Sequence, residues 1–311
     1  MRLSLILTLA LAPAGANAFD LGLPVACTLG EDCYIQQYFD HDAGPQAQDF
    51  TCGSLSYDGH NGTDFAVPTR QAMAAGVSVL AAAPGVVRGM RDGVADFEPP
   101  AEGRECGNGV VIDHAEGWQT QYCHLRQGSV LVQPGQSVAL GQPLGLIGQS
   151  GMAEFPHMHL SVRHNGVEVD PFALGAPSCG KRAEEIWTQD IPYTAGGILQ
   201  VGFADLVPEF DGVKAGMSPA PLPPQAPGLV AWAYLFGTRA GDEVLIEING
   251  PRGELLSETV AMERTQALSF RAVGRKLRGE GWPVGDYRAE VWLIRDGAEI
   301  DRAEAVLTIT P

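Results

Sequence analysis

Short runs of apolar and β-branched residues, separated by glycine-containing turns, fill the chain from about residue 55 to residue 174. The clearest runs are VSVLAAAPGVV, GNGVVIDH, WQTQYCHL, SVLVQPGQSV, LGLIGQS and HMHLSVRHNG. None of them keeps the 3.6-residue period of an amphipathic helix, and short runs bounded by turn residues are typical of β-strands. The pattern therefore predicts an all-β domain over residues 55–180.

A second series of runs follows a proline-rich stretch, SPAPLPPQAPG, at residues 218–228. Such a stretch is typical of an extended, semi-stiff linker, so residues 181–228 are expected to connect two domains. The runs after it are LVAWAYLF, DEVLIEING, GELLSETVAM, QALSFRAVG, DYRAEVWLIRDG and EIDRAEAVLTI. Six or seven strands in about 85 residues predict a small immunoglobulin-like β-sandwich at 229–311. Because this part has no histidine or cysteine, we assign it no chemistry and expect an accessory module.

The first eighteen residues, MRLSLILTLALAPAGANA, have the features of a signal peptide. Arg2 precedes an apolar run, and Ala16-Asn17-Ala18 forms a small-residue cleavage box. The apolar run is shorter than the about 20 residues that a membrane-spanning helix needs, and no cysteine directly follows the box. We therefore expect a periplasmic or secreted protein without a membrane anchor. Residues 19–54 then form an N-terminal segment that contains cysteines.

All six cysteines follow the expected cleavage point, and an even number in an exported chain favours disulfides. Cys106 and Cys123 flank two β-rich runs joined by a tight turn at residues 115–117, so a hairpin would set them nearly opposite each other. We predict that these two are bridged. Strand alternation points Cys123 away from its neighbour His124, which argues against Cys123 as a metal ligand. The pairing pattern stays open for Cys27, Cys33, Cys52 and Cys179.

The formal net charge of −17 restricts the possible partners. A strongly acidic chain is repelled by the phosphate backbone of nucleic acid, which we therefore exclude as a partner. The same charge argues against anchoring on anionic lipid surfaces.

Four histidines and one aspartate supply the candidate chemistry. They occur in GHNGTDF, YCHL and FPHMHL, and are His60, Asp64, His124, His157 and His159. On a strand, His157 and His159 share one face, because side chains alternate with a period of two. Gly62 is expected to let the chain curl and bring His60 and Asp64 together. A catalytic zinc takes three imidazole or carboxylate ligands and leaves one position for water, so this set is sufficient for a zinc hydrolase site.

The other three histidines are given ordinary structural roles. His114 ends a strand before a turn and is expected to be a hydrogen-bonding structural residue. His41 and His164 stand in polar, turn-like surroundings and are expected on the surface.

The order of these motifs carries a family resemblance. HNGTDFAVP resembles an HxGxDxxxP opening, GNGVVIDHAEGWQTQYCHL a central hairpin, and VQPGQSVALGQPLGLIGQSG followed by HMHLSV a closing segment. From Gly59 to Phe172 the chain resembles the LytM and lysostaphin-type zinc metallopeptidases, which are cell-wall endopeptidases. It departs from their pattern at Cys123, at Met158 and in a long turn-rich insertion at residues 91–105.

The resemblance implies an antiparallel β-sheet peptidase domain and assigns roles to the five residues. A Zn²⁺ ion would be held by His60, Asp64 and His159, while His124 and His157 would act on the metal-bound water and the charged intermediate. The implied substrate is the peptide cross-links of bacterial peptidoglycan.

Three functions remain open at this point. An exported zinc endopeptidase that cleaves peptidoglycan peptides is the preferred hypothesis, because zinc lowers the pKa of bound water to about 7 and polarises a carbonyl, which suits amide hydrolysis. The alternatives are a non-catalytic wall-binding or amidase-activating regulator, against which the complete ligand set argues, and a general exported zinc protease.

Overall fold

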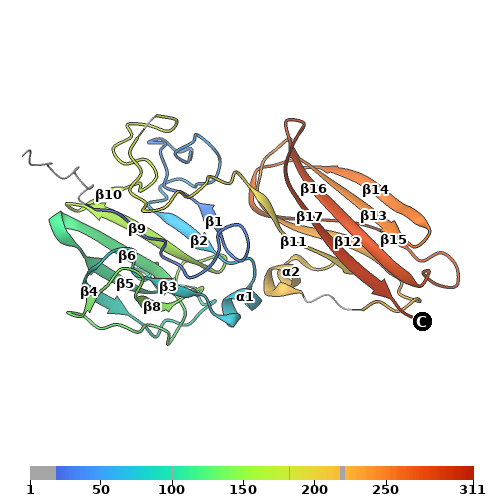
Figure 1. Ribbon diagram of the computed structural model, residues 1–311, viewed down its shortest axis with the longest axis horizontal. Coiled ribbons are helices and arrows are strands. Elements are labelled where there is room, and N and C mark those ends of the chain that lie inside the picture. Colours follow the sequence, from blue (N-terminus) through green and yellow to red (C-terminus); the bar gives the residue numbers. More distant parts are fainter. Residues whose placement is uncertain (1–18, 100, 182, 218–220) are drawn as a thin grey trace, which may run out of the picture.

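The computed structural model describes residues 19–99, 101–181, 183–217 and 221–311, so the predicted signal peptide lies outside the described residues. Strands dominate these residues, and Figure 1 shows them gathered in two lobes. The helical elements of the described chain are α1 (Arg70–Ala75), α2 (Phe210–Gly216) and the 3-10 turn η1 (Ala115–Gly117). The predicted all-β class is confirmed. Across the described ranges, no helix is long and apolar enough to cross a membrane.

The N-terminal lobe is built on an eight-stranded antiparallel sheet with the order β1-β2-β9-β6-β5-β4-β7, and β10 pairs with β9. Its strands are β1 (Tyr34–Gln37), β2 (Thr63–Ala66), β4 (Gly85–Arg91), β5 (Asn108–Asp113), β6 (Trp118–Leu125), β7 (Ser137–Val138), β9 (His157–His164) and β10 (Val167–Val169). A separate pair is formed by β3 (Ser78–Leu80) and β8 (Pro143–Leu146). Each predicted run contains a strand, although the run at 129–138 contributes only the two residues of β7. The segment before residue 55 supplies the edge strand β1.

Alternation along the central strands separates an apolar face from a polar one. Tyr122 in β6 and Leu160 and Val162 in β9 are buried in the main core of this lobe. The intervening residues of β9, His159 and Ser161, therefore lie on the opposite face of the sheet. The sheet thus buries one face to gain stability and keeps polar side chains on the other.

The C-terminal lobe contains two antiparallel sheets with the orders β11-β12-β15 and β14-β13-β16-β17. The strands are β11 (Gly197–Ala204), β12 (Gly228–Thr238), β13 (Glu243–Gly250), β14 (Gly253–Ala261), β15 (Gln266–Lys276), β16 (Gly285–Arg295) and β17 (Ala298–Ile309). Both sheets pack on a shared core that includes Leu235, Ile246 and Val291. All six predicted runs contain strands, and the seventh strand, β11, comes from the region expected to connect the domains. The immunoglobulin-like topology stays a prediction.

Three disulfides cross-link the N-terminal lobe, and no described cysteine is free. The predicted bridge between Cys106 and Cys123 is present and spans 17 positions. The two bridges that the sequence left open are Cys27–Cys33, which closes a short loop, and Cys52–Cys179, whose partners are 127 positions apart. The last of these ties the N-terminal segment to the chain that follows β10.

Candidate metal centre

Two paired strands and the turn before one of them bring three metal-ligating side chains together. In the antiparallel pair of β2 and β9, Asp64 lies opposite His159, and His60 lies in the turn three residues before β2. The Asp64 Oδ1 atom is 2.8 Å from His159 Nδ1 and 3.2 Å from His60 Nε2, and the two nitrogens are 3.2 Å apart. All three residues are buried.

This triangle of donor atoms fits a small tetrahedral ion. Zinc–nitrogen and zinc–oxygen bonds of about 2.0–2.1 Å place neighbouring tetrahedral ligand atoms about 3.3 Å apart. The three observed separations are within about 0.5 Å of that value. His60, Asp64 and His159 could therefore hold a metal ion.

Hydrogen bonds orient both histidines of the triangle. The Nδ1–H of His60 donates to the Tyr38 carbonyl oxygen at 2.6 Å, which leaves the lone pair of Nε2 directed at Asp64 and His159. The Nε2 atom of His159 is 2.9 Å from the Ser161 hydroxyl oxygen, so its Nδ1 faces the triangle. Such outer partners fix the tautomer and ring orientation of metal-ligating histidines.

Gly62 permits the close approach of the His60 turn to β9. A Cβ atom added at this position would collide with the Leu160 carbonyl oxygen and would lie 2.6 Å from His159 Nε2. His60 and Asp64 do come together across this glycine, as expected, but its φ angle is not in the positive region. The missing side chain is needed for space and not for backbone freedom.

The remaining two candidates, His124 and His157, lie beside the triangle. Their ring centroids are 4.6 Å apart, and His157 Nε2 is 3.6 Å from Asp64 Oδ1. Each ring donates its Nδ1–H to a carbonyl oxygen at 2.8 Å: His124 donates to Ser150, and His157 donates to Phe155. Because both Nδ1 atoms are engaged in this way, both Nε2 atoms carry the free lone pair. The structure thus brings all five candidate residues together on the polar face of the sheet.

The backbone at His124 is held in a left-handed conformation with φ of 63°. Such a conformation is unfavourable for a residue other than glycine and persists only where surrounding contacts enforce it. Here the His124 N–H donates to the Cys106 carbonyl at 2.8 Å, and the Cys106–Cys123 disulfide fixes the residues on either side of that bond. The bridge therefore supports the conformation that directs the His124 ring at His157.

Burial and neighbouring charges set the protonation of these groups. Burial raises the pKa of the Asp64 carboxyl, but the surrounding histidines outweigh it and hold the pKa well below the usual value. Burial lowers the pKa of His60, but the Asp64 carboxylate more than offsets this and the net pKa is raised. Burial, with a smaller contribution from His157 and His159, lowers the pKa of His124 to about 3. Burial also lowers the pKa of His157. Near neutral pH, Asp64 is therefore charged, and His124 and His157 are neutral acceptors.

The insertion at residues 91–105 lies next to this site. The Asp96 carboxylate accepts hydrogen bonds from the backbone N–H groups of Gln149 at 2.7 Å and Gln127 at 3.2 Å. Asp96 also forms a β-bridge with Ser150, whose carbonyl orients His124. The insertion thus supports the loop that positions His124.

The other histidines follow the sequence expectations only in part. His114 is a structural residue, as expected, with hydrogen-bonding contacts to the Pro84 carbonyl at 2.9 Å and the Thr120 hydroxyl at 2.8 Å. The surface assignment of His41 is wrong, because its side chain is 7% exposed and its Nε2 lies 2.7 Å from the buried Asp170 carboxylate. His164 is half-buried and stacks on Trp118 with ring centroids 4.2 Å apart.

Sequence reasoning missed the groups that orient the candidate residues. Ser161 could have been found, because the period of two places it on the same strand face as His159. The carbonyls of Tyr38, Ser150 and Phe155 leave no signal in the sequence, since every residue has a carbonyl and only the fold decides where it points.

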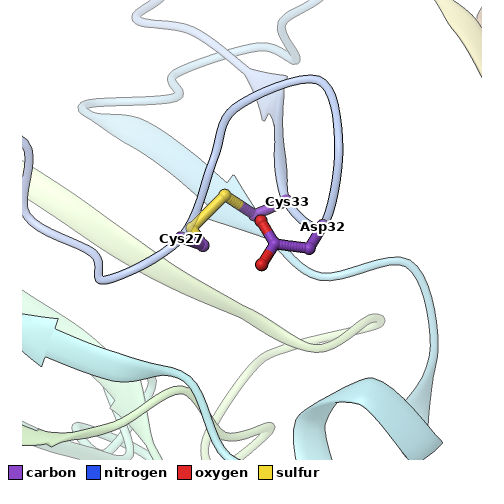
Figure 2. A group of neighbouring side chains, drawn as sticks. All are labelled: Cys27, Asp32 and Cys33. Atoms are coloured by element: carbon purple, nitrogen blue, oxygen red, sulfur yellow. A yellow bond between two sulfur atoms is a disulfide. The ribbon is translucent and has the colours of Figure 1, made fainter.

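A second cluster of potential ligand atoms carries no metal chemistry. Cys27, Asp32 and Cys33 lie close together, but Figure 2 shows the two sulfurs joined in a disulfide. A metal-binding cysteine must be a thiolate, and neither sulfur is available as one. The Asp32 carboxylate accepts a hydrogen bond from the Thr28 N–H at 2.6 Å and so caps the loop.

Comparison with known proteins agrees with the geometry. Residues 58–171 match the model of peptidase family M23. We call these residues the M23 domain, after the family that they match. The match confirms the resemblance to LytM-type metallopeptidases, and it includes all five candidate residues.

Related proteins match part of this chain. It is 36% identical over 118 residues to the peptidoglycan DD-endopeptidase ShyA of Vibrio cholerae, and 33% identical over 121 residues to the DD-carboxypeptidase/endopeptidase Mpg of Neisseria meningitidis. Each match covers 38% of this chain and 23% of the relative. The chain thus spans about a quarter of the length of the curated relatives it matches. A solved zinc-containing peptidase from Vibrio cholerae is 30% identical, with a TM-score of 0.31, over 44% of this chain and 35% of that one.

Proposed function

We propose that the protein is an exported, zinc-dependent endopeptidase that hydrolyses the peptide cross-links of bacterial peptidoglycan. The observation that carries this proposal is the donor triangle of His60, Asp64 and His159 with two further neutral histidines beside it. A zinc ion held by that triangle would polarise the scissile carbonyl and lower the pKa of a bound water to about 7.

The protein's own residues would handle the proton of the reaction. The Nε2 lone pairs of His124 and His157 are free, because the Nδ1–H group of each ring donates to a carbonyl. One of them can accept the proton of the attacking water and pass it to the amine that leaves, which returns the ring to its neutral form. While it holds that proton, the same ring can donate a hydrogen bond to the carbonyl oxygen as it becomes negative. The other ring stays neutral, and its Nε2 can accept a hydrogen bond from the attacking water and orient it.

The substrate is proposed from the relatives. ShyA is named for DD-endopeptidase activity on peptidoglycan, and Mpg for DD-carboxypeptidase and endopeptidase activity. Each match covers only 38% of this chain and 23% of the relative, so the cross-link cleaved by this chain is part of the proposal. Export is supported by the pattern of residues 1–18 and by the three disulfides, which persist in oxidising compartments.

Digestion of purified sacculi by the protein without residues 1–18 tests the proposal. Release of peptides with one cross-link hydrolysed, identified by mass spectrometry, is the expected result, together with about one zinc per chain by elemental analysis. The matched control is His159→Ala, which should release nothing. Zinc binding with cleavage of casein but not of sacculi would replace the proposal by a general protease. Binding to sacculi without any cleavage would indicate a regulator.

A further inference from the structure

A basic groove lies on the C-terminal lobe, far in sequence from the M23 domain. It has a volume of about 930 Å³ and is formed by the turn between β13 and β14, the end of β15 and the connection that leads to β16. Four cationic residues line it, namely Arg252, Arg275, Lys276 and Arg278. The connection that lines the groove enters β16 at Gly285, which pairs with Ile309 at the end of β17. The groove therefore lies at the end of the lobe that carries the carboxyl terminus, marked C in Figure 1.

The charge of this groove is opposite to that of the chain. Its lining contains four positive residues and one negative residue, Glu254, whereas the whole chain has a net charge of −17. All four cations are exposed, and among the described residues none forms an ion pair within 4.0 Å. By contrast, Arg288, Arg295 and Arg302 in the same lobe are each paired with a carboxylate. The four cations are therefore available to an outside ligand.

Two buried, hydrogen-bonded aromatic residues form the floor of the groove. Trp282 is buried and donates its Nε1–H to the Ala226 carbonyl at 2.9 Å, and the buried Tyr287 donates its hydroxyl to the Pro283 carbonyl at 3.0 Å. The aromatic faces are thus inside the lobe and not open to stacking. Guanidinium groups around a preformed hollow bind planar carboxylate and tetrahedral phosphate groups well, because both accept two hydrogen bonds from one arginine.

We propose that this groove binds an anionic glycan chain through its carboxylate or phosphate groups. The hollow shape fits an extended chain better than a flat membrane surface. Nucleic acid is disfavoured, because the overall negative charge repels it and the groove offers no exposed aromatic face on which bases could stack. The choice of a glycan rests on the proposed function, since an enzyme of the cell wall meets such polymers. The groove itself does not depend on peptidase activity, and it would hold the M23 domain near its substrate.

Binding is measured on the whole protein, without residues 1–18, carrying His159→Ala to prevent digestion. The probes are fluorescent oligogalacturonate, which carries carboxylates, phosphorylated dextran, which carries phosphates, and unmodified dextran. We expect one or both charged glycans to bind, with an affinity that falls as salt is added, and the neutral dextran not to bind. Removing two charges with R275Q and R278Q should weaken binding by about three- to thirtyfold, because each exposed ion pair contributes modestly.

A matched control distinguishes the effect of the groove on binding from the effect of the protein's overall charge. Arg104→Gln with Arg264→Gln removes the same charge from exposed positions outside the groove and should leave binding unchanged. Thermal unfolding checks that the variants remain folded. Two results would overturn the proposal: no binding of either charged glycan, or equal binding by the groove variant and the parent. Stronger binding to single-stranded DNA or to phosphatidylglycerol vesicles would likewise replace the glycan by another class of ligand. Because the assay needs no cleavage, its failure is distinct from failure of the proposed enzyme function.

Discussion

Replacement of Gly62 by alanine should disrupt the metal centre although no proposed ligand is replaced. The added Cβ would lie 2.6 Å from His159 Nε2 and 2.7 Å from its Cε1, and it would also collide with the Leu160 carbonyl oxygen. Contacts between carbon and other heavy atoms are favourable only at about 3.5 Å or more. The His60 turn and β9 must therefore separate by about 0.5–1 Å.

Such a shift should lower both the unfolding free energy and the affinity for the metal. Overpacking of a well-packed site costs about 1–3 kcal/mol of unfolding free energy, which lowers the melting temperature by several degrees. Functional sites tolerate displacements of about 0.5 Å, and the shift would separate His60 from the Asp64–His159 pair. We expect metal affinity to fall by about 10- to 100-fold, as it does when the groups that orient metal ligands are lost.

Chelator competition measures the metal affinity, and thermal unfolding measures the stability. Gly89→Ala in β4 is the matched control, because a Cβ added at Gly89 has no neighbouring atom within 4 Å. The control should bind metal and unfold like the parent. If Gly62→Ala also binds metal with the parent affinity and unfolds at the parent temperature, the packing explanation of this glycine is refuted.

Three further predictions concern the proposed site. His159→Ala should lose the metal, and unchanged zinc by elemental analysis would rule out the residue as a ligand. His124→Ala and His157→Ala should keep the metal but lose hydrolysis by on the order of 100-fold or more; cleavage of sacculi at the parent rate by either variant would exclude its catalytic role. Replacing Cys106 and Cys123 by serine should cost about 3 kcal/mol of stability and lower activity while the metal stays bound, because the bridge closes a loop of 17 positions that supports His124. Peptide mapping under non-reducing conditions that finds either thiol free in the parent would contradict this prediction.

Local patterns in the sequence were sufficient for most of the strands and for placing His157 and His159 side by side. A period of two places His157, His159 and Ser161 on one strand face, whichever sheet the strand joins. The tight turn at residues 115–117 sets the register of β5 and β6, and hence the bridge between Cys106 and Cys123. These features depend on neighbours within one strand or one hairpin, so the sequence alone could predict them.

Contacts between distant segments were decided only by the tertiary structure. The pairing of Cys52 with Cys179 across 127 positions, the burial of His41 against Asp170 and the place of β11 beside β12 leave no periodic signal. Gly62 is the clearest case. The sequence showed a glycine between two ligand candidates, but the reason for it is the approach of Leu160 and His159 from a strand almost one hundred residues away. Side-chain alternation is a property of the local backbone, whereas close packing depends on which surfaces the fold brings together.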